Sequence, residues 1–112
     1  MIFVDFYGPA ETFSTTRGAV REELGRILNV RPDTVVIRRI VTEGDGQDDA
    51  CELWVELSSE EQVFRRGADV AVGLARVVRA RGGSNVWVMF RVVPLSHAFL
   101  NGQPRARGRA SS

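Results

Sequence analysis

Two stretches of this 112-residue chain nearly repeat one another: Arg17-Gly18-Ala19-Val20 with Leu24-Gly25-Arg26-Ile27-Leu28, and Arg66-Gly67-Ala68-Asp69-Val70 with Leu74-Ala75-Arg76-Val77-Val78. One inserted residue, Asp69, brings the two into register. A strand-like run follows each stretch, Val35-Val36-Ile37 after the first and Val86-Trp87-Val88 after the second. An internal repeat of one supersecondary unit fixes the topology, and the unit here is strand–helix–strand.

The flanking sequence supplies the remaining elements. Alternating or β-branched runs predict four strands, over Ile2–Tyr7, Thr34–Val41, Cys51–Leu57 and Asn85–Val93. One helix is expected from a cap at Thr15 or Thr16 to about Leu28. Another is expected from a capping box, Ser58-Ser59-Glu60-Glu61, to about Arg79, with Gly82-Gly83 ending it.

The helices each present one apolar face, which we expect to be buried. These residues are Val20, Leu24, Ile27 and Leu28 in the first helix and Val63, Phe64, Val70, Leu74, Val77 and Val78 in the second. The strands of each half should be parallel, with a right-handed crossover. The predicted fold is therefore α/β (α+β): a duplicated βαβ unit forming a four-stranded sheet with two helices on one face. A ferredoxin-like fold has the same element order but separates the two strands of each half.

The second face of this sheet lacks a helix to cover it. Apolar residues occupy both faces of the strands, because Val36, Ile40, Trp87 and Met89 alternate with Val35, Ile37, Val86 and Val88. Arg38, Arg39 and Arg91 interrupt them. A sheet that is apolar on both faces is covered on both faces, so we expect another subunit to cover the second.

Length and composition narrow the class of protein. We expect a single domain over residues 1–103, with halves 1–50 and 51–103, and a flexible tail over 104–112. The formal net charge of +1 gives no electrostatic case for nucleic acid, and the tail arginines Arg105, Arg107 and Arg109 have no aromatic residues between them. All fifteen basic residues are arginine, which excludes lysine Schiff-base chemistry.

Cellular location follows from what the sequence lacks. Cys51 is the single cysteine, so no intrachain disulfide can form, and a reducing cytoplasm is expected. We interpret Cys51 as a packed thiol because it lies in an alternating apolar segment. No apolar run reaches the roughly 20 residues of a membrane helix, and because the first residues lack a basic region followed by an apolar stretch, we expect no signal peptide. We therefore expect no membrane and no nucleic-acid partner.

Short segments in the expected order resemble the tautomerase superfamily. Ser59-Glu60-Glu61-Gln62 and Phe99-Leu100-Asn101-Gly102 resemble the malonate semialdehyde decarboxylase type. Val41-Thr42-Glu43 resembles 4-oxalocrotonate tautomerase, and Asp45-Gly46-Gln47 resembles 5-carboxymethyl-2-hydroxymuconate isomerase. The resemblance implies a βαββαβ tautomerase-like fold, a homotrimer, active sites at subunit boundaries and catalysis without a cofactor or metal.

This chain lacks the residue that does the chemistry in that family, an N-terminal proline. It begins Met1-Ile2, and the bulky Ile2 should leave Met1 uncleaved. Alignment of the first strands puts Met1 at the place of the proline. A primary α-amine has a reference pKa of about 7.7–8.0, and desolvation or nearby positive charge would make it a better base at neutral pH. The alternative is that Met1 is a strand terminus without a chemical role.

Further site residues come from the resemblance. Arg38 matches an arginine that binds a substrate carboxylate, and its guanidinium suits that group; an intersubunit salt bridge is the alternative. Trp87 and Met89 match pocket-lining positions, with interface core as the alternative. His97 is the only histidine and a candidate proton carrier, or else a loop or interface hydrogen-bonding group. Arg17 could reach the site from the first helical turn. No second histidine or carboxylate pair at ligand spacing accompanies His97, so no metal site is expected.

These residues favour a cofactor-independent isomerase that moves a proton on an enol or keto acid, with Arg38 holding an anionic group and Met1 or His97 carrying the proton. A second hypothesis is a catalytically silent binding protein, or the non-catalytic subunit of a hetero-oligomer. A third is a specialised biosynthetic enzyme, a cyclase or decarboxylase, that uses the same pocket.

Overall fold

The computed structural model describes residues 1–44, 50–82 and 85–104. The main elements are β1 (Ile2–Tyr7), α1 (Ala10–Leu28), β2 (Val35–Ile40), β3 (Ala50–Leu57), α2 (Glu60–Arg79) and β4 (Asn85–Val92). Two 3-10 turns, η1 (Pro32–Thr34) and η2 (Leu95–His97), and a two-stranded hairpin, β5 (Phe99–Leu100) and β6 (Gln103–Pro104), complete the order. The four predicted strands and two predicted helices are all present.

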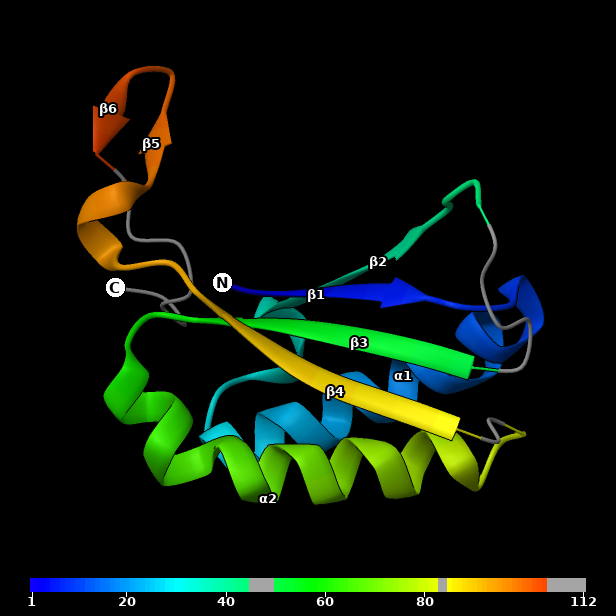
Figure 1. The fold of residues 1–112 in the computed structure, drawn as a ribbon. Helices are drawn as coiled ribbons and strands as arrows, with labels where there is room; N and C mark the ends of the chain where they lie inside the picture. The colour runs from blue at the N-terminus through cyan, green and yellow to red at the C-terminus, as the bar shows by residue number, and fades with distance from the viewer. Residues whose placement is uncertain (45–49, 83–84, 105–112) are drawn as a thin grey trace.

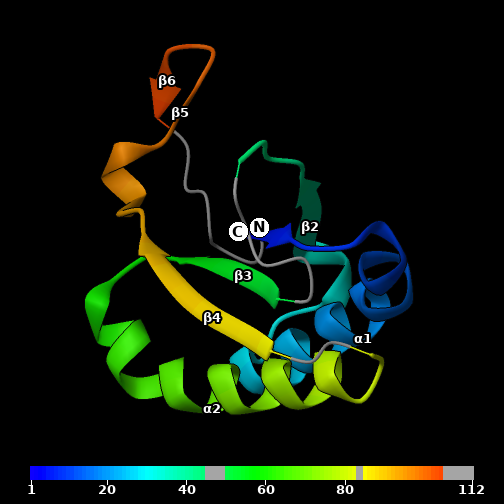
Figure 2. The same cartoon turned by 45° about the vertical axis from the view of Figure 1, so that its right-hand side comes forward.

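The four long strands form one mixed sheet in the order β2-β1-β3-β4. β1 is parallel to β2, β3 is parallel to β4, and the two halves join through the antiparallel pair β1 and β3. The two strands of each half are thus neighbours, which excludes the ferredoxin-like arrangement. Both helices lie on one side of the sheet, as Figures 1 and 2 show from two directions. The duplicated βαβ prediction is confirmed.

The core lies between the sheet and the two helices. Alternate residues of each strand face it, and β3 shows the alternation most clearly, with every second residue buried. The fully buried set includes Phe6, Leu24, Leu53, Leu74 and Val78. Cys51 belongs to this core at 1% exposure, as expected of a packed thiol, and burial raises its pKa.

The start of α2 follows from its sequence, one residue later than predicted. Ser59 is the N-cap, and its Oγ accepts a hydrogen bond from the Gln62 backbone N–H at 3.1 Å. The Gln62 side chain returns to the chain before the helix, where its Oε1 accepts from the Ser58 N–H at 3.2 Å. The two capping bonds therefore link Gln62 to Ser58 and Ser59, and Glu61 is not the acidic partner that the predicted box required.

The start of α1 was predicted wrongly. The helix begins at Ala10, directly after Pro9, and not at a threonine cap. The Thr15 and Thr16 hydroxyls instead donate to carbonyls within the helix, including that of Thr12. Residues 10–14 carry little apolar periodicity, which is why the pattern does not predict the first turn and a half of the helix.

Phe64 was expected in the core but is 90% exposed. Val63 packs against the core, and the next residue on a helix is rotated by about 100°. That rotation takes the Phe64 side chain out of the buried stripe, and it leaves an aromatic ring in solvent on the flank of α2.

The chain beyond β4 leaves the body of the sheet. η2 and the hairpin of β5 and β6 project from the end of the sheet where β4 finishes (Figures 1 and 2). The expected tail began at Pro104, but Pro104 pairs with Phe99 in the hairpin. The rest of that tail, the acidic turn residues Asp45, Asp48 and Asp49, and Gly83 lie outside the described residues. In the described part of the chain, neither helix has the length and hydropathy needed to cross a bilayer.

Candidate functional site

The face of the sheet opposite the helices, called here the open face, carries three of the six predicted site residues: Arg38, Trp87 and Met89. Alternation and register place Phe3, Asp5 and Tyr7 of β1 on it, together with Arg38 of β2, Glu52, Trp54 and Glu56 of β3, and Trp87, Met89 and Arg91 of β4. The face was expected to be largely apolar. The register does place the apolar residues Val36 and Ile40 of β2 on it, but three carboxylates and two guanidinium groups also lie there, among aromatic rings.

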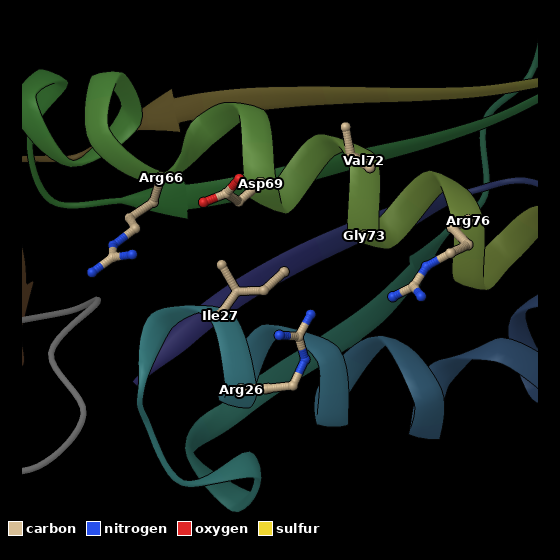
Figure 3. Close-up of a pocket in the computed structure, with 7 residues that line it drawn as sticks. All are labelled: Arg26, Ile27, Arg66, Asp69, Val72, Gly73 and Arg76. Atoms are coloured by element: carbon tan, nitrogen blue, oxygen red, sulfur yellow. The ribbon is translucent and has the colours of Figure 1, made fainter.

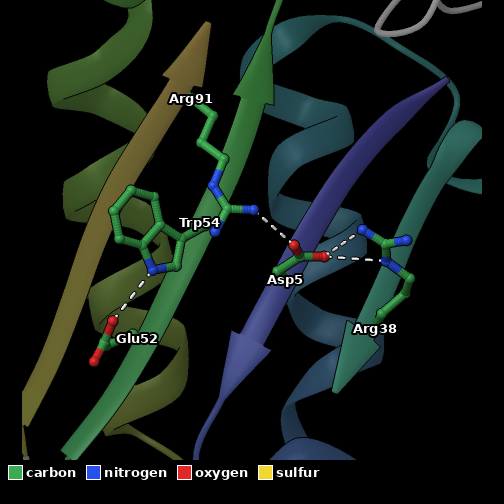
Figure 4. Close-up of polar contacts among 5 residues, drawn as sticks. All are labelled: Asp5, Arg38, Glu52, Trp54 and Arg91. Carbon is green, nitrogen blue, oxygen red and sulfur yellow. Dashed lines mark hydrogen bonds and ion pairs between the residues drawn. The ribbon is translucent and has the colours of Figure 1, made fainter. Parts of the chain in front are cut away.

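Asp5 is the centre of this face and the residue that sequence reasoning missed. It is 7% exposed, on the central strand, beside Arg38 in the parallel register. Its Oδ1 accepts from Arg38 Nη2 at 2.7 Å and Nε at 3.0 Å, and its Oδ2 accepts from Arg91 Nη1 at 2.8 Å. Figure 4 shows the two guanidinium groups reaching Asp5 from opposite sides.

The guanidinium groups of both arginines also lie over aromatic rings. Arg38 lies over the Phe3 ring at 5.5 Å, and Arg91 lies over the Trp54 ring at 4.7 Å. The Trp54 indole donates to Glu52 at 3.1 Å (Figure 4). A hydrogen bond to the Tyr7 side chain and the pairing with Asp5 raise the pKa of Arg91. The cluster thus holds both cations in fixed orientations.

Arg38 keeps hydrogen-bonding capacity for a ligand. A guanidinium has five N–H donors, and the hydrogen bonds it makes within the described part of the chain use Nε and Nη2 towards Asp5. Its side chain is 48% exposed. Arg39 points to the helix side of the sheet, as expected, where its Nε donates to the Gly8 carbonyl at 3.0 Å.

The two predicted proton carriers lie at one end of the sheet. β1 begins where β3 and β4 finish, because β1 is antiparallel to β3 and β4 is parallel to β3, so Met1 and His97 belong to the same end (Figure 1). Desolvation lowers the pKa of the Met1 amine below its ordinary value of 8.0. His97 is exposed in the η2 turn.

The structure does not bring Met1 and Arg38 together within one chain. In the parallel register Ile2 lies beside Val35 and Asp5 beside Arg38. Met1 is therefore offset from Arg38 by four residues, or about 13 Å at the rise of a strand.

Of the remaining predicted residues, two lie on the open face and one does not. Trp87 and Met89 lie on the open face, on the edge strand β4, and Trp87 is 63% exposed. Arg17 is not in the first turn, because α1 begins seven residues earlier; it lies exposed in the helix layer, over the Phe13 ring at 5.9 Å. Within residues 1–44, 50–82 and 85–104, no group of three or more His, Cys, Asp or Glu is placed to hold a metal ion.

This sheet order with both helices on one face defines the tautomerase fold. Among solved structures, the fused 4-OT wild-type symmetric trimer, a tautomerase superfamily member, matches with a TM-score of 0.60, 14% identity and 96% coverage of each chain. A macrophage migration inhibitory factor-like protein from Entamoeba histolytica has a TM-score of 0.70 and 5% identity, covering 91% of this chain and 96% of that one. A domain of unknown function (DUF1904) from Sebaldella termitidis has a TM-score of 0.73 and 14% identity, with 91% and 97% covered.

No family model matches the sequence, and no curated protein matches it either. The structural neighbours include enzymes and proteins of unknown function. At these identities the likeness establishes the fold, and the reaction has to be argued from the residues themselves.

Proposed function

We propose that this protein is a member of the tautomerase superfamily that works as a homotrimer and moves a proton on a small enol or keto acid without a cofactor. The observation that carries the proposal is the position of the Met1 amine at the end of β1, one of the two inner strands of the tautomerase fold, where partial burial lowers its pKa. The proposal takes Met1 as the first residue of the mature protein, which intact mass spectrometry checks.

The amine would act as a proton shuttle. As a free base it accepts the hydroxyl proton of the enol, and as an ammonium ion it returns a proton to the α-carbon. The enol O–H bond breaks, a C–H bond forms, the C=C–OH unit becomes CH–C=O, and the amine ends unchanged. A lowered pKa puts more of the amine in the free form at neutral pH, which general base catalysis requires.

Arg38 would hold the carboxylate of the substrate. Its remaining donors and its exposure support this role, and Asp5 would be a positioning residue that fixes the guanidinium against the Phe3 ring. Because the Met1 and Arg38 positions are offset by about 13 Å along the strands of one chain, the proposed site combines Met1 of one copy with Arg38 of another. Trp87 and Met89 would line its wall, and His97 and Arg17 stay candidates for a second proton carrier and a second anion contact.

The test uses the absence of lysine. Amine-directed acetylation of this chain has one amine to modify, the N-terminus, because every basic residue other than His97 is arginine. We expect acetylation to abolish ketonisation of a panel of 2-hydroxydienoates and phenylpyruvate enol. Arg38→Ala should raise KM at least about tenfold, whereas Arg39→Ala, on the other side of the sheet, should not.

Two results would remove this proposal. One is background rates on every enol, unchanged by Arg38→Ala. The other is full activity after complete acetylation together with full activity in His97→Gln, because no predicted proton carrier would then be in use.

A non-catalytic binding subunit is the second candidate. It is favoured by the Arg38–Asp5 pair, because a guanidinium already bound to a carboxylate of its own chain has a structural use. Co-purification of this chain with a tautomerase-type partner that carries an N-terminal proline, and absence of turnover by this chain alone, would support this candidate over the first.

A further inference from the structure

The outer side of α2 carries apolar side chains that the described part of the chain leaves in solvent. Phe64 is 90% exposed and Val72 is 70% exposed. The helix lies along the lower border of the molecule in Figures 1 and 2, and Figure 3 shows Val72 directed away from α1 and its Ile27. Residues three or four apart share one side of a helix. The side that holds Phe64 and Val72, called here the α2 stripe, consists of Glu61, Phe64, Ala68, Val72, Ala75 and Arg79.

The α2 stripe is complementary to itself when it is turned end for end. It begins with an acid, Glu61, and ends with a cation, Arg79, each nine residues from the level of Val70 on the helix. Ala68 and Val72 each lie two residues from that level. Two copies of α2 that meet antiparallel at this level therefore place each acid opposite the cation of the other copy. This is the geometry of a two-fold axis, in which residue i meets residue j and residue j meets residue i.

The charges at the two ends are available for such a contact. Glu61 binds Arg65 of the same helix at 3.0 Å, but the two side chains are 69% and 72% exposed, and an exposed pair of this kind contributes little. Among the described residues, Arg79 has no ion-pair partner within 4.0 Å. Charges at the rim of an interface fix its orientation more than its affinity. The apolar middle of the stripe has to supply the binding.

We propose that the α2 stripe is a contact between two copies of this chain, which pack antiparallel along α2. Ion pairs between Glu61 of each copy and Arg79 of the other close the two ends, and Phe64 packs beside Ala75 of the other copy. A helix of 20 residues is about 30 Å long and about 10 Å wide. Its face is smaller than the roughly 800 Å² per partner of a standard interface, so the contact is weak.

This contact is independent of the function proposed for the open face. The helices and the open face lie on opposite sides of the sheet (Figure 2), so chains that associate through the open face keep the outer side of α2 in solvent. The two associations are therefore separable by variants of α2.

Sedimentation velocity of the full chain at low ionic strength tests the contact over about 10–500 µM, the range in which so small an interface dissociates. We expect an increase in mass with concentration that Phe64→Ser shifts to at least about tenfold higher concentration. Circular dichroism checks that the variant is folded. Absence of any increase in mass, or an increase that Phe64→Ser leaves unchanged, would overturn the proposal.

Charge reversal tests the antiparallel arrangement itself. Glu61→Arg and Arg79→Glu should each weaken the association at least about fivefold, because each puts like charges together at both ends of the pair. An equimolar mixture of the two variants should associate as tightly as the native chain, since opposite charges then meet at both ends again. Glu22→Arg makes the same change of charge at an exposed position of α1 and should have no effect. A mixture as weak as the separate variants, or an equal loss in Glu22→Arg, would overturn the proposal.

Discussion

Glu23 of α1 and Arg76 of α2 form an ion pair that joins the two halves of the repeat. Arg76 lies at the position equivalent to Arg26 in the duplicated sequence, and both arginines bind the one buried carboxylate. The two equivalent arginines, one from each half, thus bind the same carboxylate, Glu23. The second half needs no acid equivalent to Glu23.

Loss of this acid should destabilise the fold. Glu23→Gln keeps the shape of the side chain but removes the charge that Arg26 and Arg76 share, and we expect a loss of about 2 kcal/mol in the free energy of unfolding. Urea denaturation measures it. Glu22→Gln, at the exposed neighbouring position, should change stability by less than about 0.5 kcal/mol. Equal effects of the two changes would contradict a role for the shared pair.

The free energy of unfolding should decrease at low pH, because Glu23 becomes protonated. Burial raises the pKa of Glu23, but hydrogen bonds from Arg26 and Arg76 outweigh this effect and hold the pKa below its ordinary 4.5. A depressed carboxyl pKa contributes stability above the unfolded value, and that contribution is lost as the pH falls through the folded value. The difference in unfolding free energy between the native chain and Glu23→Gln should therefore be largest near pH 7 and shrink below about pH 4.5. A constant difference would contradict this.

Asp5 and Arg38 should be coupled energetically. The carboxylate is buried and the guanidinium half-exposed, so a double-mutant cycle of Asp5→Asn and Arg38→Gln should give a coupling energy of about 1 kcal/mol. Chemical denaturation of the four proteins provides it. A second cycle, of Asp5→Asn and Arg39→Gln, is the control. Arg39 points to the helix side of the sheet, so its coupling energy with Asp5 should be near zero.

Gly73 allows the two helices to approach. A Cβ built there would lie 2.9 Å from both Glu23 Oε2 and Ile27 Cδ1, so Gly73→Ala should cost about 1–3 kcal/mol of stability. Gly18→Ala is the matched control, because Gly18 lies inside α1 with no atom within 4 Å of its built Cβ. This change should stabilise by about 0.5–1 kcal/mol. The opposite signs are measurable in one pair of thermal melts, and equal signs would refute the packing argument.

The periodicity of the sequence predicts which face of each strand is buried and which strands are neighbours in the sheet. Alternation over Cys51–Leu57 identified the buried side of β3, and the repeat identified which strands are adjacent. Both are local patterns, which sequence retains. The pattern does not predict the start of α1, because Pro9 precedes a turn without apolar spacing. It misplaces Phe64 because Val63 and Phe64 are adjacent apolar residues and only Val63 lies on the buried stripe.

The candidate site was predicted only in part, because the sequence pattern does not determine how the residues of one strand align with those of its neighbour. Arg38 could be chosen from its strand, but its pairing with Asp5 depends on how β1 aligns with β2. One signal was present: Asp5 is an acid within the apolar run Ile2–Tyr7 and shares its side of the strand with Phe3 and Tyr7. A buried acid in an inner strand needs a partner, and the arginines of neighbouring strands are the candidates for that partner.

The placement of Trp54 and Trp87 makes the open face optically visible. They are the only two tryptophans of the chain, both indoles lie on that side of the sheet, and Trp87 is mostly in contact with water. Association of chains through this face would therefore shift the intrinsic emission to shorter wavelength on concentration, without any label. The emission maximum, measured over a dilution series, would report the concentration at which the chains dissociate and the open face becomes exposed to water.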